Sequence, residues 1–229
     1  MAVLWYPAYL VLAAIALAIL VKIYSLVTVG KCRSTRDMSG KTVIITGANT
    51  GIGKEAAREL CRRNARVILA CRDVSKAHAT AEEIERDTGV RPACMQLDLC
   101  SFASIRQFAQ HVVAHEDRLD VLINNAGILP PPARRETEDG FEVTFQTNYL
   151  GHFLLTNLLL GFVKSDFAHR STDLYARTVG LVIRLFGKSS MDGAQTSVHL
   201  AVSEEVEGIS GKVFADCKPS FAPGKMKDA

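Results

Sequence analysis

The chain has 229 residues, enough for one domain with a hydrophobic core or for one such domain plus an anchor. Charged residues make up 22% and the formal net charge is only +3, which argues against wholesale disorder and against a nucleic-acid partner. The six cysteines form no Cys-x-x-Cys pair, so we expect reduced, mostly buried thiols in a reducing compartment. We expect the six histidines to be structural or exposed, and we predict no metal site.

The first thirty residues differ from the rest. Only Lys22 is charged between Ala2 and Val29, and a spanning helix needs about 20 mostly apolar residues. No basic side chain precedes Lys22, which argues against a cleaved signal peptide. We therefore expect residues 1–30 to form one uncleaved transmembrane helix. Basic residues follow it and place the remainder in the cytosol: Lys31, Arg33 and Arg36.

From residue 38 onward, short β-branched runs alternate with helix-like stretches. The expected strands are 42–46, 66–71, 93–97 and 119–124, and the expected helices are 54–64, 75–88 and 101–115. This alternation indicates βαβ units and an α/β domain with a doubly wound parallel sheet over residues 38–229.

A glycine-rich turn, TGANTGIG from Thr46 to Gly53, joins the first strand to the first of these helices. Glycines let backbone approach a ligand closely, and free N–H groups at a helix start favour a pyrophosphate. The spacing is not GxGxxG, and Glu55 after Lys54 excludes a P-loop. Taken alone, the turn is also compatible with a tight strand–helix connection that binds nothing.

Two further motifs end strands at the same sheet edge. Asp98-Leu99 follows the third strand and NNAG, Asn124 to Gly127, follows the fourth. TGxxxGIG, Asp-Leu and NNAG in this order resemble the short-chain dehydrogenase/reductase family. ACRD, NYLGHFLLT and SGKVFADCK behind an anchor resemble its microsomal retinol dehydrogenase branch; they span residues 70–73, 148–156 and 210–218.

The resemblance implies a Rossmann-like fold and a set of cofactor contacts. The cofactor phosphates would be held by Gly47, Asn49, Thr50, Gly51, Ile52 and Gly53. The adenine would be bordered by Asp98 and Leu99, and the nicotinamide-side ribose by Asn125, Ala126 and Gly127. Cys71 and then Arg72 stand where an NAD enzyme would place an acidic residue, so NADP(H) is favoured. The alternative for Arg72 is a solvated surface charge.

Hydride transfer to a carbonyl needs a proton donor for the developing alkoxide. In the family this donor is a tyrosine with a lysine four residues later, aided by a serine and by a water-holding asparagine. Asn148 fits the asparagine, although it could equally make local hydrogen bonds. None of the five tyrosines is followed by lysine at the fourth position; they are Tyr6, Tyr9, Tyr24, Tyr149 and Tyr175.

The chain runs from an expected helix, 147–160, directly into a Gly161-led loop that resembles the one after the family's sixth strand. A βαβ unit takes about 30 residues or more, and this junction holds none. We therefore expect an internal deletion near 160/161, with two strands and a helix missing. Beyond it we expect Ser165 near the nicotinamide amide, a helix over 191–203 and a last strand over 210–214.

The resemblance implies NADP(H)-dependent interconversion of retinol and retinal, or of similar lipophilic alcohols and aldehydes, at the cytosolic face of the endoplasmic reticulum. For this chain we expect no efficient catalysis and, because the sheet loses strands, poor stability. The alternative is a membrane-tethered, non-catalytic dinucleotide-binding or interaction protein. Self-association stays open.

Overall fold

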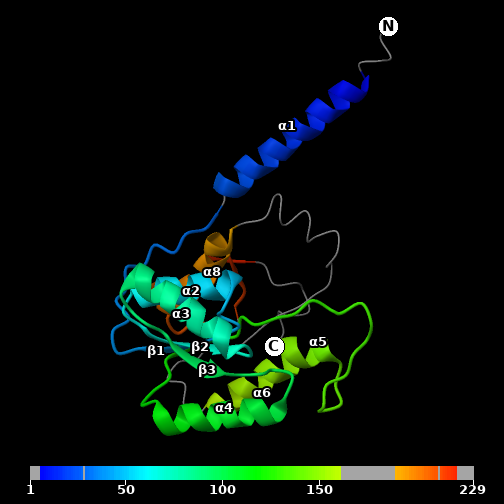
Figure 1. Ribbon diagram of the computed structural model, residues 1–229. Helices are drawn as coiled ribbons and strands as arrows, with labels where there is room; N and C mark the ends of the chain where they lie inside the picture. The colour runs from blue at the N-terminus through cyan, green and yellow to red at the C-terminus, as the bar shows by residue number, and fades with distance from the viewer. Residues whose placement is uncertain (1–5, 28, 161–188, 211, 221–229) are drawn as a thin grey trace.

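The computed structural model describes residues 6–27, 29–160, 189–210 and 212–220. Its main sheet is parallel, with strand order β3-β2-β1-β4 (Figure 1). The strands are β1 Thr42–Thr46, β2 Arg66–Cys71, β3 Ala93–Gln96 and β4 Val121–Ile123. The doubly wound parallel sheet is therefore confirmed, and β1 and β2 have the predicted bounds.

Helices cover both faces of this sheet (Figure 1). On one face lie α2 Gly51–Arg62, α3 Val74–Thr88 and α8 Ser190–Val202. On the other lie α4 Phe102–His115 and α6 Gly151–Leu159, the latter preceded by the short α5 Val143–Phe145 and the π-helical turn η2 Gln146–Leu150. A 3-10 turn, η3 Glu204–Val206, follows α8. The predicted helix positions are confirmed to within a few residues.

The central strand β1 shows why the sheet needs two helical layers. Val43 and Ile45 point into the core beneath α2, α3 and α8, whereas Ile44 points into the core beneath α4 and α6. All three are fully buried. Such a strand lacks a polar face, as expected for a parallel strand covered on both sides.

The edge strand β4 is less protected than β1. It pairs with β1 on one side, and no other described strand pairs with it. Its three residues, Val121 to Ile123, are only half-buried, while all of β1 is buried. Part of the leucine-rich helix α6 still finds a core, because Leu155 and Leu159 are fully buried. Residues 161–188, which include Ser165, lie outside the described residues.

The predicted extent of the last strand, 210–214, is wrong. The structure has β5 Phe214–Ala215 paired antiparallel with β6 Lys218–Pro219, in a two-stranded sheet of their own. The two-residue turn between them has φ of 52° at Asp216 and 58° at Cys217. Two positive φ values in succession favour a tight hairpin, and the sequence reading overlooked this because neither residue is glycine.

The N-terminal helix α1, Tyr6–Val27, projects away from the domain (Figure 1). Many of its apolar side chains are exposed, among them Leu17, Leu20 and Val27. Among the described parts of the chain, no helix meets the combined demands of length and apolar character for crossing a bilayer. The transmembrane helix expected over residues 1–30 is therefore not confirmed.

Residues 29–36, the linker, run along the C-terminal part of the domain. The Gly30 N–H donates to Asp216 Oδ1 over 3.5 Å, and the Cys32 N–H donates to Gln195 Oε1 over 3.0 Å. The Ser34 hydroxyl donates to the Val202 carbonyl over 3.3 Å. The linker is therefore held by both α8 and the hairpin.

Candidate functional site

The glycine-rich turn has the form of an anion cradle. Thr50 precedes α2 with an extended backbone and makes no side-chain cap to the first N–H groups of the helix. Gly51 has φ of 58°, and a Cβ there would meet nothing within 4 Å. A Cβ at Gly53, by contrast, would lie 2.4 Å from Asn125 Nδ2 and 3.0 Å from the Gly47 carbonyl oxygen, so a side chain there would displace Asn125. Uncapped N–H groups that face open space fit the pyrophosphate of a dinucleotide.

The hydroxyl of Thr46 joins the ends of β1 and β4. It accepts hydrogen bonds from the N–H groups of Asn125 at 2.9 Å and Ala126 at 3.0 Å. Asn125 returns a bond from Nδ2 to the Thr46 carbonyl at 2.9 Å. Two predicted cofactor residues are thus fixed to the start of the glycine-rich turn.

His152 on α6 extends this network. Its Nε2 lies 2.9 Å from Thr46 Oγ1, and its Nδ1 lies 3.4 Å from the Asn148 carbonyl oxygen. Burial lowers the pKa of His152, so the neutral ring is favoured. Because a carbonyl only accepts, Nδ1 carries the proton and Nε2 accepts from the hydroxyl. The sequence analysis expected a structural or exposed histidine here but not its contact with Thr46, because the two residues are 106 positions apart.

Asn148 lies in the π-helical turn η2, and both ends of its amide are occupied. Oδ1 accepts from the Ile128 N–H, and Nδ2 donates to the Ile128 carbonyl, each over 2.9 Å. The side chain thereby ties the loop after β4 to the helix through tertiary bonds, and these are not the local hydrogen bonds of the alternative. A water-holding role for Asn148 would have to use its backbone, and that role stays a prediction.

The end of β2 presents a buried thiol and then an exposed cation. Burial raises the pKa of Cys71 to about 11, although the N–H groups of Ala48 and Asn49 hydrogen-bond its sulfur. Arg72 is exposed, and none of the ion pairs among the described residues involves it. Asp73 points elsewhere and caps α3 by accepting from the Lys76 N–H. The guanidinium of Arg72 is therefore available to an anion.

The remaining predicted cofactor residues lie at the same carboxyl edge. Asp98 follows β3, and its Oδ1 accepts from the Cys100 N–H over 2.9 Å. Leu99 is buried against α6, where a Cβ on Gly151 would approach the Leu99 carbonyl oxygen to 2.7 Å. Gly127 is exposed and faces the Asn148 side chain. Thr50, Gly51 and Ile52 are exposed as well, so the turn is open to solvent.

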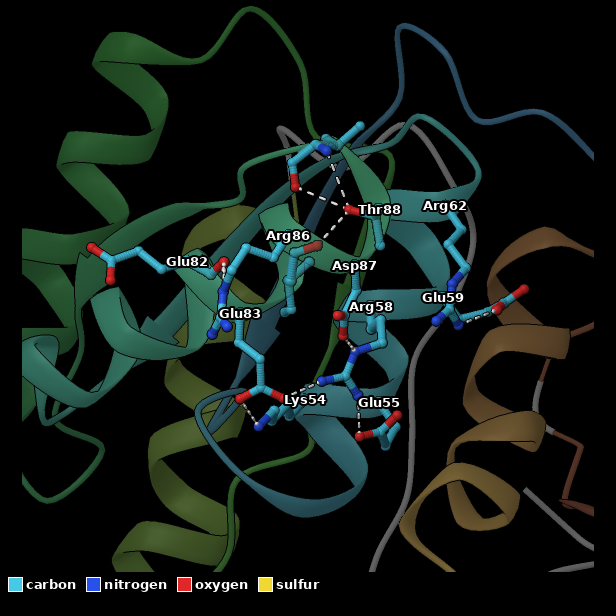
Figure 2. Close-up of polar contacts among 12 residues, drawn as sticks. Lys54, Glu55, Arg58, Glu59, Arg62, Glu82, Glu83, Arg86, Asp87 and Thr88 are labelled. Carbon is cyan, nitrogen blue, oxygen red and sulfur yellow. Dashed lines mark hydrogen bonds and ion pairs between the residues drawn. The ribbon is translucent and has the colours of Figure 1, made fainter.

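An ion-pair network holds α2 against α3 behind the turn (Figure 2). Arg58, almost fully buried, pairs with Glu55, with Glu83 at 2.6 Å and with Asp87 at 2.9 Å. Lys54 pairs with Glu83 at 2.6 Å. The α3 hydroxyl of Thr80 also donates to the Asn49 carbonyl, over 3.0 Å. These bonds fix the helix whose first N–H groups are predicted to bind the cofactor phosphates.

Neither a disulfide nor a group of metal ligands is present among the described residues. All six cysteines are free; Cys61 and Cys71 are buried and the other four are half-buried. Burial raises the pKa of Cys61 to about 12, which makes it an inert thiol. Within the described residues, no group of three or more histidine, cysteine or acidic side chains is arranged to hold a metal ion.

The family model for short chain dehydrogenases matches residues 41–170, more than half of the chain. The chain belongs to this family. Retinol dehydrogenase 12 from Bos taurus is 38% identical over 269 residues, covering 87% of this chain and 85% of the relative. Human retinol dehydrogenase 13 is 51% identical over 158 residues, covering 69% and 47%. The relatives place this chain in the retinol dehydrogenase branch, and a nicotinamide dinucleotide is the family's cofactor.

Solved structures agree with this assignment. An uncharacterised protein from Mycobacterium paratuberculosis has a TM-score of 0.54 and 36% identity, covering 74% of this chain and 63% of the other. A short-chain dehydrogenase from Shigella flexneri 2a, crystallised with NADP, has a TM-score of 0.51 and 30% identity, covering 71% and 69%. The chain thus spans just under two thirds of the first of these proteins.

Proposed function

We propose that this chain is a truncated, catalytically impaired form of an NADP(H)-dependent oxidoreductase acting on retinol and retinal or similar lipophilic alcohols and aldehydes. One contrast carries the proposal. The dinucleotide edge is assembled around Thr46 and the glycine-rich turn. Yet no tyrosine in the chain has a lysine four residues later. The chain therefore keeps the residues for cofactor binding and lacks the tyrosine–lysine pair that serves as the family's proton donor.

The alignments support an internal gap. The alignment to bovine retinol dehydrogenase 12 is 269 residues long, whereas 87% of this 229-residue chain is only about 199 residues. About 70 positions of that alignment therefore have no counterpart in this chain. The alignment to human retinol dehydrogenase 14 has the same imbalance, with 278 residues against 83% of this chain. A gap of that size is enough for a strand–helix–strand unit.

The residues present fit the proposed cofactor. The N-terminus of α2 and Gly51 would receive the pyrophosphate, and Asn125 to Gly127 would border the ribose beside the nicotinamide. A nicotinamide supplies or accepts the hydride when bound. Arg72 would hold a 2′-phosphate, because a guanidinium can donate two parallel hydrogen bonds to it. This preference for NADP(H) over NAD(H) rests on the exposure of Arg72 and on Cys71 in place of an acid.

We also propose that the N-terminal segment attaches the protein to the endoplasmic reticulum membrane, with the domain in the cytosol. The support is the row of exposed apolar side chains on α1, such as Leu12, Leu17 and Leu20, each more than 60% exposed. Water disfavours such a surface and a lipid phase accepts it. The basic residues that follow α1 suit the cytosolic side.

The same observations leave room for a second function from another class, a membrane-tethered dinucleotide-binding or interaction protein without turnover. The half-buried strand β4 favours it, because β4 pairs with β1 on one side only among the described strands, and an open strand edge can receive a partner. NADPH binding without turnover would fit both the truncated enzyme and the non-catalytic binding protein. The transcript distinguishes these two functions. An exon between the codons for Leu160 and Gly161 that encodes Tyr-x-x-x-Lys would identify this chain as the truncated enzyme.

The test uses the full chain in detergent micelles. NADPH binding is measured by fluorescence, and turnover by retinal-dependent loss of NADPH absorbance. We expect binding without turnover. Arg72→Glu should weaken NADPH binding roughly tenfold or more, as expected for losing a charge-assisted bidentate contact, and leave NADH binding nearly unchanged. Arg106→Glu, an equally exposed arginine on α4, is the matched control. Efficient retinal reduction by this chain would refute the impairment.

A further inference from the structure

Two histidines stand one helical turn apart on the exposed side of α4. His111 and His115 are both solvent-exposed, and their rings are stacked with centroids 4.0 Å apart and planes 19° apart. Residues four apart in a helix lie on the same face, so this proximity follows from the His-x-x-x-His spacing. Both histidines are exposed, which is one of the two environments expected for the histidines from the sequence.

The hydrogen bonding of His115 determines which of its nitrogens is free. Nδ1 lies 2.9 Å from the backbone carbonyl oxygen of His111. Because that oxygen can only accept, Nδ1 carries the proton and Nε2 keeps its lone pair. Such a bond from the second ring nitrogen to a carbonyl is the usual support of a metal-binding histidine, since it fixes the tautomer and raises the basicity of the ligating nitrogen.

Ring separation is also suitable for chelation. An ion such as Zn²⁺ lies about 2.0–2.1 Å from each imidazole nitrogen, so two ligating nitrogens stand roughly 3 Å apart. With the ring planes only 19° apart, the in-plane lone pairs run nearly parallel, so binding requires the exposed His111 ring to turn to another rotamer while His115 keeps its bond to the His111 carbonyl. Neutral imidazole is preferred by zinc, copper and nickel over magnesium or calcium.

We propose that His111 and His115 form a two-histidine chelate for one borderline divalent cation of the nickel, copper or zinc class. The two imidazoles supply two ligands, and water completes the coordination, since no group of three or more ligating side chains occurs in the described residues. The pair belongs to α4, on the sheet face opposite α2, and is not part of the dinucleotide edge. The proposal is therefore independent of the proposed function.

Ni²⁺ is the probe, titrated calorimetrically into the full-length protein in micelles. We expect one equivalent of Ni²⁺ to bind. We expect His111→Asn and His115→Asn each to weaken this binding roughly tenfold or more, because a single remaining imidazole binds the ion more weakly than two imidazoles held on the same helix. His78→Asn, which removes a single exposed histidine from α3, should bind like the unmodified protein. Both pair members are exposed, so circular dichroism should show unchanged helicity in every variant.

A composition-matched variant tests the spacing itself. His111→Asn combined with Gln110→His keeps two histidines on α4 but moves one of them to a different face. It should bind Ni²⁺ as weakly as His111→Asn alone. Unchanged Ni²⁺ affinity in His111→Asn or His115→Asn would show that the cysteine thiols or other groups hold the ion. That result, or no binding to the unmodified protein, would overturn the proposal.

Discussion

Replacing Thr46 by valine tests the hydrogen-bond junction at the carboxyl edge most directly. The side chain is fully buried and the substitution preserves its shape, so the main change is loss of the hydroxyl. The Ala126 N–H would then lose its acceptor, whereas the Asn125 N–H would keep its second bond, to the Ile123 carbonyl at 3.0 Å. One donor left unsatisfied costs about 1–3 kcal/mol, so we expect Thr46→Val to lower the free energy of unfolding by about 1–3 kcal/mol. A loss of that size is measurable against the roughly 5–15 kcal/mol typical of a domain.

The assay is urea unfolding of the full chain in micelles, followed by pulse proteolysis of the domain. Thr42→Val is the matched control, because Thr42 is also buried in β1 and its hydroxyl makes no hydrogen bond within the described part of the chain. Thr46→Ser keeps the hydroxyl and should lose much less stability. A Thr46→Val protein as stable as Thr42→Val would refute the reasoning that the hydroxyl joins β1 to β4.

Three further predictions concern stability, each measured by the same urea unfolding. Because burial lowers the folded pKa of His152, the unfolded state binds more protons below its ordinary pKa of about 6.5, so stability should fall from pH 7.5 to 5.5 and fall less in His152→Asn. Cys217→Gly should stabilise the protein by about 0.5–1 kcal/mol by relieving the positive φ, whereas Cys217→Ala should not. Arg58→Met should cost about 2–3 kcal/mol, less than a fully buried pair because Glu83 and Asp87 are partly exposed, and Arg58→Lys should cost less; equal stability of Arg58→Met and the unmodified protein would contradict this.

Much of the fold was predictable because, in the first half of the chain, the hydrophobic periodicity and the turn-forming residues between elements indicate the same boundaries. The runs TVIIT and RVILAC have the length and β-branching of strands buried on both faces, and their bounds were predicted correctly. The helix before residue 160 was also predicted, but its π-helical turn at 146–150 was not. That turn depends on tertiary bonds, such as those from Asn148 to Ile128, which no local pattern encodes.

The site was predictable to the extent that it is made of backbone. Glycines at a strand–helix junction predict a phosphate-binding turn, which stays a prediction, and the close approach of Gly53 to Asn125 is one packing reason for glycine there. The Thr46–His152 contact joins residues that are 106 positions apart and therefore leaves no local signature. The hairpin at Asp216 and Cys217 was missed for a related reason, since residues with side chains seldom adopt two positive φ values in succession.

The hydrogen bonds of the linker limit the distance between the domain and the end of α1. Three steps along the backbone separate Val27 from Gly30, which is hydrogen-bonded to Asp216, and they can span at most about 11 Å. The end of α1 therefore lies within about 11 Å of Gly30, the residue bonded to the β5–β6 hairpin. A surface that receives the whole of α1 would hold the hairpin side of the domain at close range.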